Sequence, residues 1–237
     1  MSSRFERMFK EEYHKQNFHK SQYHIDAETE IIETLNEEMK NENKSLDVDW
    51  NTPQPQTTIE YDTAYGLCSN VFLKKLEDYG CSWRVLRLPS LTDQILIKTM
   101  RIRSIQKTGV NKVGDEIIDE LIGIANYGVM AIIQHRLGYV DSVDSINNDT
   151  IVQEYSKTFN EVFQLMLMKN HDYGEAWRSM RVSSMVDLIL TKLLRIKQIE
   201  NNDGKTIVSE GVETNYADIV NYAIFSIILL QNENNGK

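Results

Sequence analysis

The sequence predicts an all-α protein, built as a pseudo-symmetric helical bundle from a tandem duplication and carrying an N-terminal extension. The first observation is an internal repeat: residues 71–105 and 165–199 align at a constant offset of 94, and 16 of the 35 aligned positions are identical. About two identities would be expected by chance. A second matching stretch follows one inserted residue later, IGIANYGVMAII from Ile122 against ADIVNYAIFSII from Ala217. The chain therefore contains two copies of one unit.

The second observation is a helical period in the apolar residues. At about 100° per residue, the apolar residues of 182–199 fall on one side of a helix: Val186, Ile189, Leu190, Leu193, Leu194 and Ile196. Asp187, Lys192 and Arg195 fall outside that arc. Residues 88–105 give the same pattern, with Asp93, Lys98 and Arg101 opposite Ile95, Leu96, Met100 and Ile102. Alternating β-branched runs are scarce, so a sheet is not expected.

Each copy is predicted to contain three elements in the same order. A first helix ends at an Asp-Tyr-Gly, because Gly80 or Gly174 can adopt a positive φ. The charged amphipathic helix comes next, followed by a loop with Gly and Lys and then a helix through the shared Asn-Tyr pair. That last helix is apolar nearly all round, so it is expected to be buried. We place the copies at 61–140 and 150–237 and expect them to pack as one globular unit.

Residues 1–60 form an acidic extension that lies outside the repeat. Residues 25–60 contain ten Asp or Glu against two Lys or Arg. Residues 26–44 are compatible with an acidic helix, and Pro53 and Pro55 mark a linker. The first 25 residues are expected to be disordered.

Composition excludes several classes of protein. The net charge of −9 comes mainly from the extension, so the body of the chain does not repel a phosphate-bearing ligand. Without a dense Lys/Arg stripe, binding to long nucleic acid is not expected. Apolar stretches fall short of the roughly 18 residues that a membrane span needs, and the first residues do not resemble a secretory signal. We therefore expect a cytoplasmic protein with reduced cysteines and no membrane partner; a homo-oligomer is compatible with the sequence.

Charged and aromatic positions match between the copies at least as well as apolar ones, which favours a ligand site over a unit kept only for packing. The candidate ligand-binding residues are the pairs Lys75/Lys169, Asp78/Asp172, Trp83/Trp177, Arg87/Arg181, Asp93/Asp187, Lys98/Lys192, Arg101/Arg195 and Asn126/Asn221, together with Tyr173. Lysine and arginine can hold phosphates, and carboxylates can hold Mg²⁺.

Each of these candidates also has a structural interpretation. The buried asparagines can link one copy to the other, since an amide in an apolar helix needs a hydrogen bond. The tryptophans can pack in the core instead of stacking on a base. The charged helix faces can be solvated and self-paired. The sequence leaves these alternatives open.

The copies differ in their acids near the last helix. Asp218 lies one turn before Asn221, whereas the first copy has Gly123 at the equivalent position. Glu210 and Glu213 precede Asp218. If a metal is held by carboxylates, the second copy is the more complete site, and the first is a degenerate partner. The five histidines form no metal motif, and no P-loop, GxGxxG or GxSxG occurs.

Three segments of the second copy, KNHDYGEAW, RVSSMVDLILTKLLRIKQI and DIVNYA, resemble the nucleotide modification associated domain 1 family (DUF1599). In the first copy EDYGCSWRVLRLPSLTDQILIKTMRIRSI is similar to another copy of that domain, and the resemblance covers about 61–233. The family is similar in broad style to all-α nucleotide pyrophosphohydrolases of the MazG and dimeric dUTPase kind. It therefore implies an all-α site for Mg²⁺ and a nucleotide. MazG-like enzymes carry paired acids on successive helices, whereas here the charged helix has Asp187 with Lys192 and Arg195.

The resulting hypothesis is a nucleotide-binding protein that acts as a Mg²⁺-dependent nucleoside triphosphate pyrophosphohydrolase. In this hypothesis Asp172, Asp187, Glu213 and Asp218 hold the metal, and the last three are the catalytic residues that orient water. Phosphate charge is neutralised by Lys169, Arg181, Lys192 and Arg195, and Trp177 or Tyr173 contacts the base. Two alternatives are a non-enzymatic module that senses a nucleotide or binds a protein, and a purely structural dimerisation domain.

Overall fold

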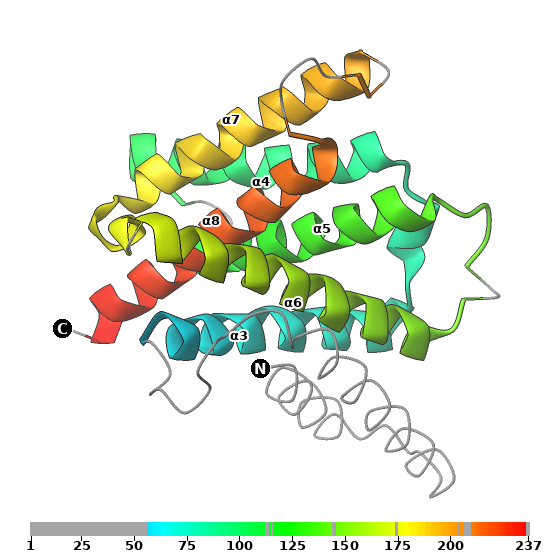
Figure 1. Cartoon of the computed structure of the whole chain (residues 1–237), viewed down its shortest axis with the longest axis horizontal. Coiled ribbons are helices and arrows are strands. Elements are labelled where there is room, and N and C mark those ends of the chain that lie inside the picture. Colours follow the sequence, from blue (N-terminus) through cyan, green and yellow to red (C-terminus); the bar gives the residue numbers. More distant parts are fainter. Residues whose placement is uncertain are drawn as a thin grey trace, which may run out of the picture.

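The computed structural model describes residues 56–111, 114, 116–143, 146–173, 175–202, 204–205 and 210–235, with the backbone alone at 171–173 and 234–235. Over these residues the protein is all-helical and contains no strand, which confirms the predicted fold class (Figure 1). In chain order the elements are α3 (Gln56–Tyr79), η2 (Ser82–Val85), α4 (Leu88–Thr108), α5 (Ile117–Leu137), α6 (Asn148–Tyr173), η3 (Ala176–Ser179), α7 (Val182–Asn201) and α8 (Val212–Asn235). The predicted helix over 26–44 and the disordered N-terminus lie outside the described residues.

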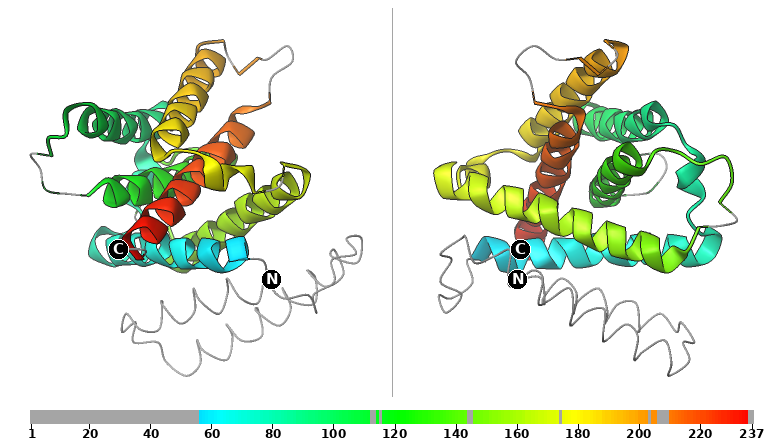
Figure 2. Two further views of the ribbon diagram at one scale, coloured as in Figure 1. Left: turned by 90° about the vertical axis from the view of Figure 1, so that its left-hand side faces the viewer. Right: turned by 45° about the vertical axis from the view of Figure 1, so that its right-hand side comes forward.

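Each helix of the first copy lies beside its equivalent in the second. The central pair is α5 and α8; α4 and α7 lie on one side of it, and α3 and α6 lie on the other (Figures 1 and 2). Between α3 and α6, Tyr61 packs on Phe163 with ring centroids 4.9 Å apart, and Phe72 stacks on Tyr155 at 3.9 Å. The first half of each of these helices therefore meets the second half of the other, so the pair is antiparallel.

The helix ends follow from local sequence. The chain leaves α3 through Gly80, whose φ of 63° is in the left-handed region, as the Asp-Tyr-Gly predicted; Gly174 lies outside the described residues. Pro89 lies in the first turn of α4, where its missing N–H costs no hydrogen bond. At the start of α5, Glu116 and Asp119 form a reciprocal capping box, which satisfies backbone N–H groups that have no partner within the helix.

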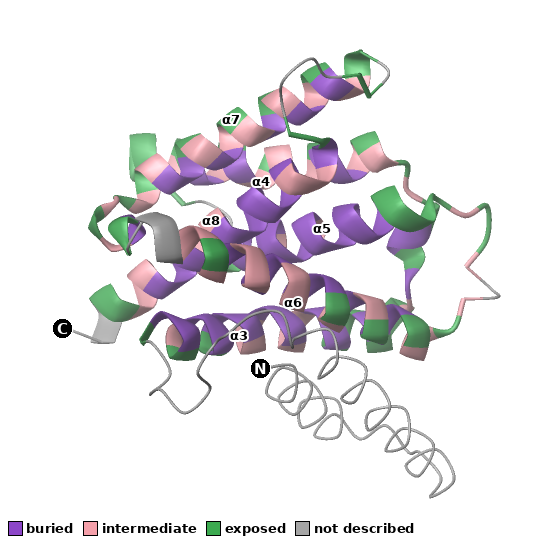
Figure 3. Ribbon diagram, in the orientation of Figure 1, coloured by how far each residue is buried: buried purple, intermediate pink, exposed green. Residues whose placement is uncertain are grey.

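The two central helices are buried, as their all-round apolar character predicted (Figure 3). By length and composition alone, Ile117–Leu137 could also cross a membrane, but 67% of that apolar window is buried inside the protein. Its neighbours are α8, α4, α3 and α6. The hydropathy of α5 therefore follows from its position at the centre of the bundle.

The asparagine of each central helix links the two copies. Asn126 Nδ2 donates to the Cys68 carbonyl at 3.0 Å, and its Oδ1 accepts from the Tyr155 hydroxyl at 2.6 Å. In the same way Asn221 Oδ1 accepts from Tyr61 at 2.8 Å, and its Nδ2 donates to a carbonyl of α6. Tyr61 and Tyr155 are themselves 94 residues apart. Each amide thus binds a tyrosine from the other copy, which is the structural role considered above.

Three details differ from the sequence expectation. Met100 and Leu194 are 48% and 53% exposed, although the helical period of the sequence assigned them to the buried, apolar side of their helices. Around the helix axis they lie only about 20° from Asp93 and Asp187, respectively. The side of each helix that carries the aspartate faces solvent. The first helix also starts at Gln56, before the expected boundary of the repeat, because Thr57 and Thr58 are already buried.

Candidate functional site

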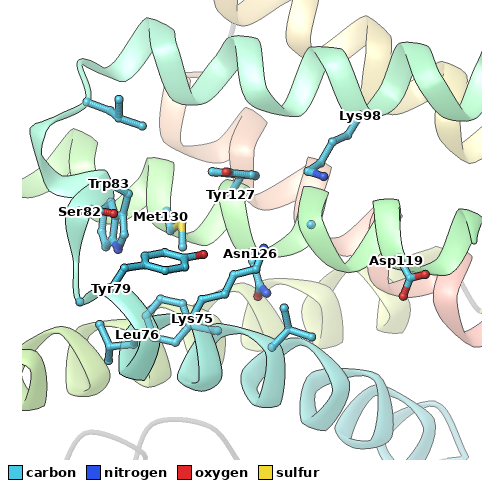
Figure 4. Close-up of a pocket in the computed structure, with 15 residues that line it drawn as sticks. Lys75, Leu76, Tyr79, Ser82, Trp83, Lys98, Asp119, Asn126, Tyr127 and Met130 are labelled. Carbon is cyan, nitrogen blue, oxygen red and sulfur yellow. The ribbon is translucent and has the colours of Figure 1, made fainter. Parts of the chain in front are cut away.

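A cavity of about 260 Å³ lies within the first copy, between α3, α4 and α5 (Figure 4). Its lining residues all come from that copy and combine aromatic, aliphatic and basic side chains: Val71, Phe72, Lys75, Leu76, Tyr79, Gly80, Ser82, Trp83, Leu86, Lys98, Asp119, Gly123, Asn126, Tyr127 and Met130. Four of the predicted ligand residues, Lys75, Trp83, Lys98 and Asn126, therefore meet at one place. The cavity belongs to one copy rather than to a pocket shared by both.

One end of the cavity is aromatic. Tyr79 at the end of α3, Trp83 in η2 and Tyr127 in α5 face it, with Met130 beside them (Figure 4). The Trp83 indole N–H is buried and has no hydrogen-bond partner in the part of the chain that the structure describes. Burial raises the pKa of both tyrosines, and their protonated hydroxyls can donate or accept a hydrogen bond. This end can accept a flat ring and offer it hydrogen bonds.

The other end of the cavity is basic. Lys98 extends from α4 on one side, and Lys75 comes from α3 on the opposite side (Figure 4). Lys98 Nζ lies 3.2 Å from a carboxylate oxygen of Glu120, and Arg101 pairs with the other oxygen of the same group. No ion pair or hydrogen bond joins Lys75 to another described residue. Since an ammonium group has three donors, both lysines can still bind an anion.

The equivalent positions of the second copy are occupied differently. Lys169 and Lys192 each lie 2.5 Å from one oxygen of Asp218, a carboxylate that is almost completely buried. Burial by itself would lower the pKa of Lys169, but the hydrogen bond and the charge of Asp218 raise it overall. Trp177 stacks on Phe225 with centroids 4.3 Å apart and planes 6° apart. Here the protein itself supplies ion-pair partners for the lysines and a stacking partner for the tryptophan, while the Trp177 N–H, like that of Trp83, has no hydrogen-bond partner among the described residues.

The two aspartates of the charged helices lie away from these lysines. Asp187 is exposed and pairs with Arg103 at 3.1 Å, and Asp93 pairs with Lys197 at 2.6 Å. These two ion pairs are equivalent under the repeat and join α4 to α7. The physical reason is the helical period: five residues turn the helix by about 140°, so Asp187 and Lys192 face different neighbours.

The residues predicted to hold Mg²⁺ are not gathered in the described part of the protein. Asp187 faces Arg103, Asp218 faces two lysines, and Glu213 pairs with Arg136 at the end of α5. The side chains of Asp172 and Tyr173 lie outside the described residues. Among those that are described, no three His, Cys, Asp or Glu side chains form a group that could hold a metal. The three carboxylates of this set that the structure describes do not form a Mg²⁺ site, because each already pairs with a base.

The remaining predicted ligand residues lie outside the cavity. Asp78, Arg87 and Arg181 are exposed, the two arginines at the starts of α4 and α7. Arg101 is held by Glu120. Arg195 is partly buried and lies near Tyr222, whose pKa is raised overall by burial.

Sequence reasoning left out several residues that shape the cavity. Tyr79 and Tyr127 match Tyr173 and Tyr222 in the alignment, so the repeat itself contained the signal for them. Gly123 was interpreted as the loss of a carboxylate. In the structure the absence of a side chain at Gly123 matters in another way, because a Cβ there would lie 2.7 Å from Lys98 Cε.

The position of Asp187 leads to a first prediction. Asp187→Ala should reduce the free energy of unfolding by less than about 1 kcal/mol, because an exposed ion pair contributes little. It should also leave ligand binding unchanged. Urea denaturation and calorimetric titration test both statements, with Asp93→Ala as the matched variant in the first copy. A complete loss of an activity on Asp187→Ala alone would instead support the catalytic role expected from sequence.

Comparison with known proteins agrees with the duplication. The family model described as nucleotide modification associated domain 1 matches residues 75–135 and again residues 169–230, together more than half of the chain. The two matches contain the two lysine pairs, both charged helices and both asparagines. Neither the curated proteins nor the solved structures give a significant match. The chain therefore belongs to the nucleotide modification associated domain 1 (DUF1599) family, of which it carries two tandem copies.

Proposed function

We propose that the protein binds a nucleotide in the cavity of the first copy. The observation that carries this proposal is the combination of four aromatic side chains, Phe72, Tyr79, Trp83 and Tyr127, with two lysines in one cavity of about 260 Å³. A nucleotide has the same two-part chemistry, a flat ring at one end and phosphate at the other. The family name is consistent with such a ligand.

The ring of the ligand would lie against Trp83, Tyr79 and Tyr127. Stacking of a base on an aromatic side chain contributes about 1–3 kcal/mol and tolerates different bases. The hydroxyls of Tyr79 and Tyr127 at this end can donate to the edge of the base or accept from it.

The phosphate would lie between Lys75 and Lys98. Asp119 and Glu120 are the acids nearest to this end, and both already have partners: Asp119 accepts from the backbone N–H of Glu116 at 3.0 Å, and Glu120 binds Lys98 and Arg101. The cavity therefore keeps a positive balance at the phosphate end. Hydrolysis of the nucleotide with Mg²⁺ rests on the family resemblance alone.

A binding experiment with one substitution in the cavity tests this proposal. Lys75→Ala should weaken nucleotide binding by about 10-fold or more, since a charge-assisted hydrogen bond contributes about 1.5–3 kcal/mol. Calorimetric titration with nucleoside mono- and triphosphates, with and without Mg²⁺, measures this loss. Because Lys75 has no described partner, the melting temperature of the free variant should not change.

Lys74→Ala is the matched control. Lys74 is the preceding residue of α3, is exposed and does not line the cavity, so its removal changes the net charge equally without changing the site. Equal losses for the two variants would contradict the proposed location. Binding of no nucleotide would favour a structural or protein-binding module. Product analysis of any nucleotide that binds separates hydrolysis from binding alone.

A further inference from the structure

Among the positions at which the two copies differ, one lies between two lysines that both copies share. Gly123 of α5 aligns with Asp218 of α8, whereas Lys75 aligns with Lys169 and Lys98 aligns with Lys192. The lysine framework is therefore present twice, and the carboxylate between the lysines is present once.

In the second copy the carboxylate takes the place of a bound anion. Asp218 Oδ1 accepts from Lys169 Nζ and Oδ2 accepts from Lys192 Nζ, each at 2.5 Å. The residue is 5% exposed, so the two ammonium groups hold it in a site with little water. Charge-assisted contacts of this kind are short and strong.

In the first copy the same place is part of the cavity. Gly123, Lys75 and Lys98 all line it, and no described carboxylate joins Lys75 to Lys98. A Cβ on Gly123 would lie 3.0 Å from Lys98 Nζ, so an aspartate at this position would bring its carboxylate to Lys98. Glu120, the acid that does bind Lys98, is one turn earlier on α5.

A second difference between the copies lies at the aromatic end, where the second copy again supplies its own partner group. Phe225 stacks on Trp177 in the second copy, and the equivalent of Phe225 is Met130, which lines the cavity beside Trp83. Asp218 and Phe225 are seven residues apart on α8, about 10 Å along the helix axis. The second copy thus carries, on its own helix, an anion and a flat ring where the first copy has a glycine and a methionine.

We infer that Asp218 is a built-in substitute for the ligand's anion, and that the first copy binds an anionic group of its ligand between Lys75 and Lys98, above Gly123. The second copy is closed to that anion by its own carboxylate. One chain therefore binds one anionic ligand, although the fold repeats the lysine pair. This inference rests on the proposed ligand cavity and adds the position of the anion, the residue that decides which copy binds, and the stoichiometry.

Exchanging the two residues tests the inference in the full-length protein. The probes are ATP and inorganic pyrophosphate, titrated by calorimetry at low salt. The native protein should bind one equivalent of pyrophosphate. Gly123→Asp should weaken that binding by about 10-fold to 100-fold, because its carboxylate takes the anion's place on the lysines. Asp218→Gly should raise the number of bound equivalents from one to two.

Matched variants separate charge from size. Gly123→Asn adds nearly the same volume as Gly123→Asp without the charge, and it should weaken pyrophosphate binding less. Asp218→Asn removes the charge but keeps the volume. The number of pyrophosphate equivalents bound per chain should therefore stay closer to one in Asp218→Asn than in Asp218→Gly. Circular dichroism and thermal unfolding check that each variant is folded; the second copy already accommodates an aspartate at this position, so we expect Gly123→Asp to fold.

The outcomes distinguish this inference from the proposed function. If the protein binds pyrophosphate, Gly123→Asp weakens that binding, and neither ATP nor another nucleotide binds, the anion site is supported and the proposal that the ligand is a nucleotide is refuted. If a nucleotide binds and Gly123→Asp does not weaken its binding, the anion site is refuted and the proposed function, nucleotide binding, stands. Two equivalents in the native protein, or no pyrophosphate bound by either the native protein or Asp218→Gly, overturns the inference.

Discussion

The free energy of unfolding is expected to fall steeply once the pH exceeds about 10. Four tyrosines in the core are fully buried, Tyr61, Tyr65, Tyr155 and Tyr216, and burial raises the pKa of each above its ordinary value of 10.0. In the unfolded chain these phenols lose their protons near pH 10, whereas in the folded protein they keep them. The folded state then binds more protons, so stability decreases as the pH rises.

The size of this effect follows from the number of protons. Each tyrosine contributes about 1.4 kcal/mol per pH unit, so the four together contribute ~5 kcal/mol per unit above pH 10. The stabilisation is fully present below pH 10 and is lost above it. The pKa of Lys169 is also raised, through Asp218, which adds a loss of the same sign above its ordinary value of 10.5. Urea denaturation at several pH values between 8 and about 11 measures the slope.

Two phenylalanine substitutions identify the groups responsible. Tyr155→Phe should make the unfolding free energy fall less steeply with pH, by about 1.4 kcal/mol per pH unit, the contribution of one tyrosine. It should also lower the stability at neutral pH, because it leaves Asn126 Oδ1 without its donor. Tyr139→Phe is the control, since Tyr139 is 59% exposed and its phenol meets water in both states. A stability that is constant from pH 9 to 11 would show that the buried tyrosines do not act in this way.

Gly128→Leu should cost about 3 kcal/mol or more by forcing the two central helices apart. Even a Cβ at this position would lie 2.6 Å from Val220 Cγ2 and 3.8 Å from the Tyr216 carbonyl oxygen. Val220 is fully buried, and a β-branched side chain on a helix has one strongly preferred rotamer, so it cannot turn away. Overpacking of this kind is destabilising by itself, and the α5–α8 contact lies at the centre of the bundle.

A smaller substitution shows whether Val220 is the cause. Gly128→Ala should be destabilising in the native background and less so in a Val220→Ala background, which a double-mutant cycle by urea denaturation measures. Gly123→Ala is the matched control on the same helix. Its Cβ would meet only the flexible end of Lys98, so that change should be nearly neutral. Equal costs for Gly123→Ala and Gly128→Ala would contradict this account of the close approach.

Much of the candidate site was present in the sequence as a set of residues, but not as an arrangement. The alignment of the copies identified Lys75, Lys98, Trp83 and Asn126, and all four line the cavity. The same criterion also selected Asp93, which pairs with Lys197 on the surface between α4 and α7. A matched position in a repeat can be kept for a ligand or for the contact between copies, and sequence alone does not separate the two.

By itself the sequence determined the helices, their order, the duplication and the burial of the central pair, because these depend on local propensity and on the 3.6-residue period. Only the tertiary structure decided which charges meet. Whether Lys98 faces Gly123, or Lys192 faces Asp218, depends on how far one helix is shifted along and rotated against another. That register is set by packing across the whole core, such as the contact of Gly128 with Val220, and no short stretch of sequence contains it.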